Sequence, residues 1–309
     1  MSLLAGNDVL AATKTNQTRT NKVLKQRVIT AIILLLALTI VATQLPSFYF
    51  AIVISLLILI ASWEWTGFIG LSRQSTKITY LLTVAFMLLG LFFLLGVTPN
   101  AVEIDEIRVA VILALGLLFW LLSVFVLTGY PQNSRQWNDE SKIASMGLFA
   151  LAPAWTGIVT LKYLLPSGYL VLALVVLIAA VDVGAYFAGK SFGSRKLAPN
   201  LSPKKTWEGV WGGMVACLLV SAGLAWCMHN YMIKLSIMQM AFLICLSAVL
   251  TFFSVVGDLV ESMLKRNQNL KDSGALLPGH GGILDRVDGL IAAIPVFVLT
   301  MMLIISDIG

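Results

Sequence analysis

Four aspartates lie within or beside apolar stretches of the 309-residue sequence: Asp182, Asp258, Asp285 and Asp288. A carboxylate in such surroundings is costly, so it usually faces a partner, a polar cavity or the interior of a helical bundle. Asp285 and Asp288 are three residues apart, so one face of a helix would carry both. Because carboxylate oxygens without cysteine ligands favour a hard cation over zinc, we expect these acids to gather around a divalent ion such as Mg²⁺.

The segment 261–288 combines bases, glycines and acids. Its cationic side chains match phosphate oxygens in charge and hydrogen-bonding capacity: Lys265, Arg266, Lys271 and Arg286. Three glycines surround His280, among them Gly281 and Gly282, and they precede an expected helix start whose free N–H groups attract anions. His280 itself has two interpretations of equal weight, donation to a phosphate or fixing of the loop. The acids of this segment would hold a metal ion that bridges the bound phosphates.

A second polar segment, 189–209, contains the run Ser202-Pro203-Lys204-Lys205-Thr206. With Glu208 behind it, this run is similar to a second phosphate clamp, in which Lys204, Lys205 and Thr206 contact the substrate. By itself, a lysine pair at a membrane edge is more often a topology signal or a contact with anionic lipid. We do not expect ATPase chemistry of the Walker A type, in which a glycine-rich loop surrounds the phosphates.

Each of these features has a simpler explanation. An isolated Asp-x-x-Asp at a helix start is more often a solvated pair that complements the helix dipole, and bases beside apolar runs often only set topology. Asp182 and Asp258 weigh against the first explanation, because they lie inside apolar runs where solvation is not available. Glu64, between two tryptophans, is interpreted as structural or as extending to the membrane surface, and not as catalytic.

The composition indicates which elements position these residues. The chain is 59% hydrophobic and only 12% charged, with a mean hydropathy of +0.91, whereas a soluble domain is roughly 25% charged. These values exclude a soluble, disordered, collagen-like or disulfide-rich protein. We predict an all-α, polytopic transmembrane helical bundle of about nine spans, near residues 28–45, 48–70, 78–97, 107–128, 145–165, 168–190, 209–229, 237–260 and 289–306.

The basic residues predict the orientation of the bundle. With the N-terminus in the cytoplasm, 18 of the 21 lysines and arginines fall in the inside loops, as the positive-inside rule requires. The C-terminus is then outside, and the four aspartates lie at the cytoplasmic side. Nucleic-acid binding is not expected, because the bases stand in short clusters between apolar runs. Residues 1–22 are expected to form a polar, mobile segment, and 23–309 a single membrane domain with its catalytic part at about 168–306.

The polar segments together resemble the phosphatidate cytidylyltransferase, or CDP-diacylglycerol synthase, family. Residues 262–288 read S-x-L-K-R-x4-K-D-x-G-x2-L-P-x-H-G-G-I-x-D-R-V-D and are similar to the family signature at every defined position. The same likeness holds for G-D-L-x-E-S at 257–262, D-x-x-A-Y-x-x-G-K-x-F-G at 182–193, K-L-x-P-x-L-S-P-K-K-T-x-E-G at 196–209 and L-K-Q-R-V at 24–28. The resemblance covers roughly residues 23–306 and is sharpest in the last 130 residues.

The resemblance implies the conversion of CTP and phosphatidate to CDP-diacylglycerol and diphosphate, for membrane phospholipid biosynthesis. It implies one or two Mg²⁺ ions, with room for a monovalent ion such as K⁺. Asp258 and Asp285 match the catalytic, metal-binding acids of the family; we expect Asp288 to assist them and Asp182 to orient ligands or a lysine. The bases of both segments would be shared between the triphosphate and the lipid phosphate, with Lys265 and Arg286 nearest the chemistry.

The resemblance also implies surroundings and partners. The enzyme would be a multi-pass protein of the cytoplasmic (inner) membrane, with its active site facing the cytoplasm. Its partners would be CTP, phosphatidate and membrane lipids, and no nucleic acid. Family members are dimers, so a homodimer is implied.

Three other functions agree less well with the sequence. The pattern of a CDP-alcohol phosphotransferase begins at Asp288-Gly289, but Ala293 replaces its arginine and its later acids are missing. A lipid transporter would show internal repeats and acids near the middle of the membrane, whereas these acids lie at one side. A non-catalytic subunit would leave the acids and the phosphate-type segments without a role.

Overall fold

Eight helices in the computed structural model are long and apolar enough to cross a membrane. The structure describes residues 30, 32–231, 234–276 and 281–306, so the predicted polar segment 1–22 lies outside the described residues. The eight helices are α2 (Ser47–Ile69), α3 (Gln74–Leu95), α4 (Glu106–Thr128), α6 (Glu140–Leu164), α7 (Tyr169–Phe192), α8 (Trp207–Tyr231), α9 (Ile237–Asn267) and α10 (Leu284–Ser306).

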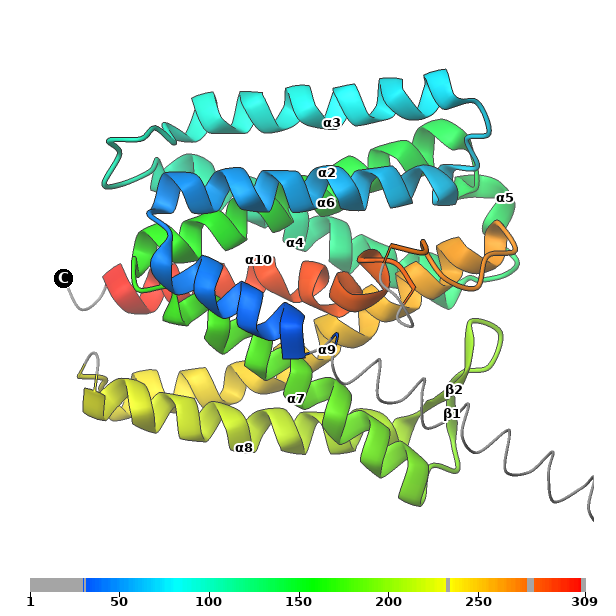
Figure 1. Ribbon diagram of the computed structural model, residues 1–309. Coiled ribbons are helices and arrows are strands. Elements are labelled where there is room, and N and C mark those ends of the chain that lie inside the picture. The colour runs from blue at the N-terminus through cyan, green and yellow to red at the C-terminus, as the bar shows by residue number, and fades with distance from the viewer. Residues whose placement is uncertain (1–29, 31, 232–233, 277–280, 307–309) are drawn as a thin grey trace, which may run out of the picture.

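The predicted all-α bundle is confirmed, and eight of the nine expected spans are present among the described residues. The first expected span, 28–45, is represented by a shorter apolar helix, Ile32–Gln44, and the chain before it lies outside the described residues. A single-turn helix, α5 (Ser134–Trp137), lies between α4 and α6. The long helices run side by side, and the loops alternate between the two ends of the bundle (Figure 1).

Helices α6 and α10 form the interior of the bundle. Most of the spanning window of each is buried within the protein, whereas α3, α4 and α8 leave most of theirs exposed. Figure 1 shows α10 between α4 and α6 on one side and α7, α8 and α9 on the other. The side chains that α10 buries are almost all apolar, so this helix is held by packing along its length. The residues at the start of α10 therefore lie at the centre of one end of the bundle.

One segment departs from the all-helical prediction. Residues 189–209 were expected to be a polar loop, but they include a small antiparallel hairpin of β1 (Lys196–Ala198) and β2 (Ser202–Thr206). Pro199 and Asn200 lie at its turn, as their conformational preferences favour. Glu208 on α8 accepts hydrogen bonds from the backbone of Ser194 and Arg195, at 3.1 and 3.2 Å, which ties the start of the hairpin to its end. Lys204 and Lys205 therefore stand on a defined strand.

Helix α9 has 31 residues, a length of about 46 Å at 1.5 Å per residue, which exceeds the roughly 30 Å hydrocarbon core. One end of α9 must therefore extend into a polar region. Its C-terminal end carries Glu261, Lys265 and Arg266, and it lies at the same end of the bundle as the hairpin and the start of α10 (Figure 1).

Helices α9 and α10 approach each other closely at Gly257. A Cβ atom at this position would lie 2.3 Å from the backbone oxygen of Asp288 and 2.9 Å from the Cβ of Ala292. Only a residue without a side chain allows this distance. Gly257 precedes Asp258 in the chain, so the same contact brings Asp258 and Asp288 to the two sides of one helix crossing.

We expect Gly257→Ala to push α10 away from α9, because the backbone oxygen that the methyl would meet has no rotamer into which it can move. Overpacking of this kind costs about 1–3 kcal/mol of unfolding free energy. Thermal unfolding in detergent should therefore occur at a lower temperature than for the wild type. Gly223→Ala on α8 is the matched control, since its methyl would meet nothing within 4 Å. Equal unfolding temperatures for the two variants would contradict the close approach.

Candidate active site

The four predicted aspartates share one cavity at the hairpin end of the bundle. The cavity has a volume of about 440 Å³, and the described residues that line it are all polar or charged, so we call it the acidic cavity. Helix α7 contributes Asp182, strand β2 contributes Lys205, and α9, α10 and the loop between them contribute the rest: Asp258, Glu261, Ser262, Lys265, Asp272, Asp285, Arg286 and Asp288. Acids from three membrane-spanning helices therefore meet in one place.

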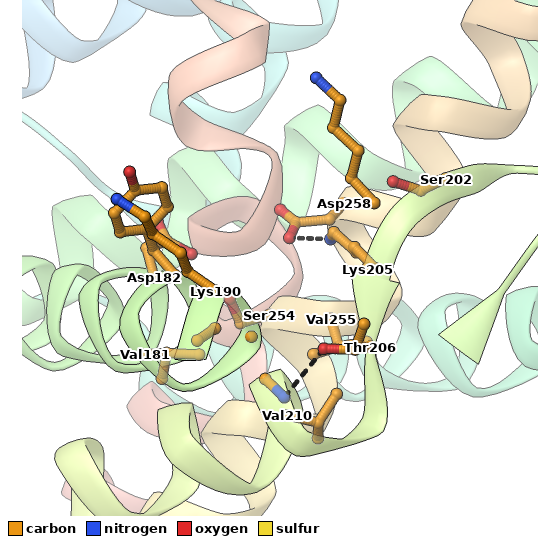
Figure 2. A pocket seen from close by; sticks show the side chains of 15 residues that line it. Val181, Asp182, Lys190, Ser202, Lys205, Thr206, Val210, Ser254, Val255 and Asp258 are labelled. Atoms are coloured by element: carbon orange, nitrogen blue, oxygen red, sulfur yellow. Dashed lines mark hydrogen bonds and ion pairs between the residues drawn. The ribbon is translucent and has the colours of Figure 1, made fainter. Parts of the chain in front are cut away.

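A second cavity of about 480 Å³ adjoins the first. We call it the mixed cavity, because apolar side chains of α7, α8 and α9 form one part of its wall and polar side chains of the hairpin form another. Asp182, Lys205 and Asp258 line both cavities. Figure 2 shows Asp182 and Lys190 on α7 across the mixed cavity from Lys205 and Asp258.

An ion pair between Lys205 and Asp258 stands at the boundary of the two cavities (Figure 2). The two side chains are 28% and 21% exposed, so each is desolvated on one side while its charged end still reaches a cavity. Strand β2 carries the lysine and α9 the aspartate, 53 residues apart in the chain. The hairpin thereby places a cation where a phosphate group in either cavity would meet it.

Asp285 has more hydrogen bonds than a solvated helix start would give it. Its Oδ1 accepts from Lys265 Nζ at 2.8 Å, and its Oδ2 accepts from the backbone N–H groups of Ser273 and Gly282 at 2.9 and 2.8 Å. Its position in the first turn of α10 also suits a negative charge. Asp285 is therefore an anchor for the loop before α10 as well as a cavity-lining acid.

Glu261 is a site residue that the sequence analysis did not assign. It is buried, and its Oε2 accepts from Lys265 Nζ at 2.8 Å, so one lysine joins Glu261 and Asp285. Its other oxygen, Oε1, is buried and has no hydrogen-bond partner among the residues that the structure describes. Asp288 interacts electrostatically with both Asp258 and Glu261. The signal in the sequence was available, since Glu261 lies three residues after Asp258 on the same face of α9.

The residues of the acidic cavity fit a hard cation by their chemistry. Within the described part of the chain, no three His, Cys, Asp or Glu side chains are already arranged as a metal site. The ammonium groups of Lys205 and Lys265 instead neutralise Asp258 and Asp285. The unpartnered oxygen of Glu261, beside Asp258 and Asp288, is an acceptor that a cation would satisfy.

The predicted substrate-binding residues divide into three groups. Lys204, Lys205 and Thr206 line the mixed cavity, and the Thr206 hydroxyl also accepts from the Gly209 N–H at 3.2 Å at the start of α8. Arg266 and Lys271 line neither cavity; Arg266 instead donates to the backbone oxygen of Leu201 in the hairpin.

The remaining predicted residues belong to the loop before α10. Gly282 holds Asp285 through its N–H, and Gly281 adopts a φ of 84°, which favours glycine. His280 lies outside the described residues.

Residues 184–191 read G-A-Y-F-A-G-K-S, which has the spacing of a Walker A loop. The sequence analysis overlooked this match. All eight lie within α7, so their backbone N–H groups are used within the helix and cannot surround a phosphate as in a P-loop. The segment therefore matches the motif in spacing alone and does not form its loop.

Comparison with known proteins agrees with the family resemblance of the sequence. The family model of the cytidylyltransferase family matches residues 25–304, a range that includes every residue of both cavities. The phosphatidate cytidylyltransferase of Pseudomonas aeruginosa is 39% identical over 274 residues, which are 89% of this chain and 95% of that protein. That of Haemophilus influenzae is 35% identical over 286 residues, which are 89% and 97%. That of Bacillus subtilis is 46% identical over 120 residues, which are 39% and 42%.

Lys265→Gln is expected to destabilise the protein more than changes at the other site lysines. It leaves Glu261 and Asp285, whose side chains are 7% and 6% exposed, without their cation, and such a loss costs about 3–5 kcal/mol. Lys205→Gln affects a more exposed pair and should lower the unfolding temperature less. Lys204→Gln, at an exposed position of the same strand, should unfold as the wild type does. Similar losses for Lys265→Gln and Lys204→Gln in detergent would contradict the buried network.

Proposed function

Because this chain belongs to the cytidylyltransferase family, we propose that it transfers the cytidylyl group of CTP to phosphatidate and releases diphosphate. The observation that carries this proposal is the pair of cavities that meet at Lys205 and Asp258. One substrate of the reaction is fully polar and the other is a lipid, so an enzyme must bring a polar and a partly apolar compartment together at the reacting phosphates.

The acidic cavity suits the nucleotide. None of the described residues that line it is apolar, and Lys205, Lys265 and Arg286 provide cationic donors for triphosphate oxygens. Its carboxylates would repel a bare triphosphate, and they would bind one that carries divalent cations. We therefore assign CTP, as its Mg²⁺ complex, to this cavity.

The mixed cavity suits the lipid. Val181, Ala185 and Val210 form an apolar part of its wall, and the first part of the acyl chains would lie against them. Lys190 and Lys204 line the same cavity and would bind the phosphate group. The lipid phosphate would then lie beside Lys205, at the boundary with the nucleotide.

In the reaction, an oxygen of the phosphatidate phosphate attacks the α-phosphorus of CTP. A new P–O bond forms in line with the bond that breaks, and diphosphate leaves with the electron pair of that bond. No protein nucleophile is needed, because positioning and charge stabilisation supply the catalysis. Lys205 would orient the attacking phosphate, and Lys265 and Arg286 would stabilise charge on the leaving diphosphate.

We propose Mg²⁺ as the cofactor, held by Asp258, Glu261 and Asp288, with Asp285 across the same cavity. Bound there, Mg²⁺ would neutralise the phosphate oxygens around the α-phosphorus. The predicted set of Asp258, Asp285 and Asp288 is extended by Glu261 because this residue lines the same cavity and one of its buried oxygens has no partner within the described part of the chain. Before loading, Lys205 and Lys265 keep Asp258 and Asp285 paired.

The chain is a multi-pass membrane protein. We propose that it lies in the cytoplasmic membrane with both cavities toward the cytoplasm, where CTP is made. The distribution of basic residues supports this orientation. The proposal also includes the homodimer that the family resemblance implies, and it includes no nucleic-acid partner.

The purified chain in mixed micelles should convert CTP and phosphatidate to CDP-diacylglycerol, and EDTA should abolish product until Mg²⁺ is restored. Asp258→Asn and Asp285→Ala should each lower the rate by about a hundredfold or more, because each removes a carboxylate from the proposed metal-binding cavity. Product formation from labelled CTP measures both effects. Glu103→Gln, in an exposed loop at the other end of the bundle, is the control. An Asp285→Ala protein with a near wild-type rate would refute the metal assignment.

Val210→Phe tests the assignment of the two substrates. A ring at this position fills part of the mixed cavity, at a cost of about 1–3 kcal/mol for the bound lipid, so the KM for phosphatidate should rise about tenfold. The KM for CTP should change by less than about twofold, since Val210 does not line the acidic cavity. Val215→Phe, at an exposed position on the same helix, is the matched control. A rise in the KM for CTP alone would reverse the assignment.

A further inference from the structure

Glu64 on α2 is an acid whose environment differs from that expected of a membrane-surface residue. It is 5% exposed, so its side chain does not extend to water. It belongs to the N-terminal half of the chain, and α2 contributes no residue to either cavity. Of the two interpretations given above, extension to the membrane surface is therefore wrong, and a structural role remains.

The Glu64 carboxylate binds the start of α10 and the loop before it. Oε1 accepts from the Ile283 N–H at 3.0 Å, and Oε2 accepts from the Leu284 N–H at 2.9 Å and from the Ser273 hydroxyl at 3.2 Å. The first N–H groups of a helix have no partner within the helix, and a negative charge there is favourable. Glu64 thus caps a helix that begins 220 residues later in the sequence.

The same loop is also held by Asp285. Ser273 gives its hydroxyl to Glu64 and its N–H to Asp285. Gly282 gives its N–H to Asp285, while Ile283 and Leu284 give theirs to Glu64. Two carboxylates, one from α2 and one from α10, therefore fix the path of the chain into α10. Movement of the loop away from Glu64 would also break the backbone hydrogen bonds that orient Asp285.

The loop packs closely against Glu64. A Cβ atom at Gly274 or at Gly282 would lie 2.6 Å from one of the Glu64 oxygens. The carboxylate is already held by three donors, so it could not move aside without losing them. The contact between α2 and this loop is therefore a defined fit of backbone to carboxylate.

We propose that Glu64 is a positioning residue for Asp285, and through it for the cation and the triphosphate in the acidic cavity. This inference rests on the proposed function. A full carboxylate is required, because it can accept all three donors. Glutamine offers one oxygen and would turn an N–H₂ group toward backbone N–H groups, and aspartate is one methylene too short to reach them.

The test is Glu64→Gln in the full-length, detergent-solubilised protein. We expect kcat to fall about tenfold and the Mg²⁺ concentration for half-maximal rate to rise about tenfold. The KM for phosphatidate should stay within about twofold, because the mixed cavity does not contact α2. Hydrogen exchange at the amides of 281–285 should become faster, with or without Mg²⁺. Glu140→Gln, an exposed acid in the first turn of α6, is the control and should change none of these quantities.

Ser273→Ala provides a second variant should Glu64→Gln not fold. It removes one donor to Glu64 and leaves the backbone contact with Asp285, so the same changes should appear with smaller size. In the double variant, the combined effect should be smaller than the sum of the two single-variant effects, since both changes act on one contact. Unchanged Mg²⁺ dependence and unchanged exchange in Ser273→Ala and in any folded Glu64→Gln protein would overturn the proposal.

The two hypotheses fail separately. Wild-type protein that makes no CDP-diacylglycerol would refute the proposed function, whereas the exchange measurement would still decide whether Glu64 holds the loop. Wild-type protein that makes product, with a Glu64→Gln variant of normal kcat and normal Mg²⁺ dependence, would refute the positioning role alone.

Discussion

The arrangement of this protein depends on one constraint, that a carboxylate among its membrane-spanning helices is costly without a partner. Asp258 pairs with Lys205 of the hairpin, and Glu261 and Asp285 share Lys265. An unpaired charge in such a place costs several kcal/mol, so the hairpin, α9 and the start of α10 cannot shift independently. A lysine that pairs with an acid here can also leave it for a phosphate, which makes the same contacts suitable for binding and release.

Helix α10 transmits this constraint through the whole bundle. Apolar packing holds α10 in place along its whole length, and the contact at Gly257 fixes its crossing with α9. Its N-terminus receives Glu64 from α2 and carries Asp285. The N-terminal half of the chain therefore contributes to the site by fixing the position of α10, although α2 does not line either cavity.

The two adjoining cavities offer an explanation of how a polar substrate and a lipid substrate could react with each other. A compartment whose described lining residues are all polar or charged adjoins one with a partly apolar wall, and Asp182, Lys205 and Asp258 belong to both. Phosphoryl-type transfer needs positioning and charge stabilisation more than covalent participation by the protein. Bases and acids at a shared boundary are therefore sufficient to catalyse it. The lipid can keep its acyl chains near the bilayer while its phosphate reaches the nucleotide.

Much of this could be predicted from the sequence because it depends on local patterns. Apolar runs of about 20 residues predict spans wherever they occur, and the spacing of Asp258, Asp285 and Asp288 around those runs predicts that the acids lie at one end. The partners of those acids could not be predicted, because Lys205 is 53 residues from Asp258 and Glu64 is 220 residues from Leu284. The packing of α2, α9 and α10 decides which groups meet across such separations. It thereby decided between the two interpretations of Glu64 in favour of a structural role and defined the contacts that this residue makes.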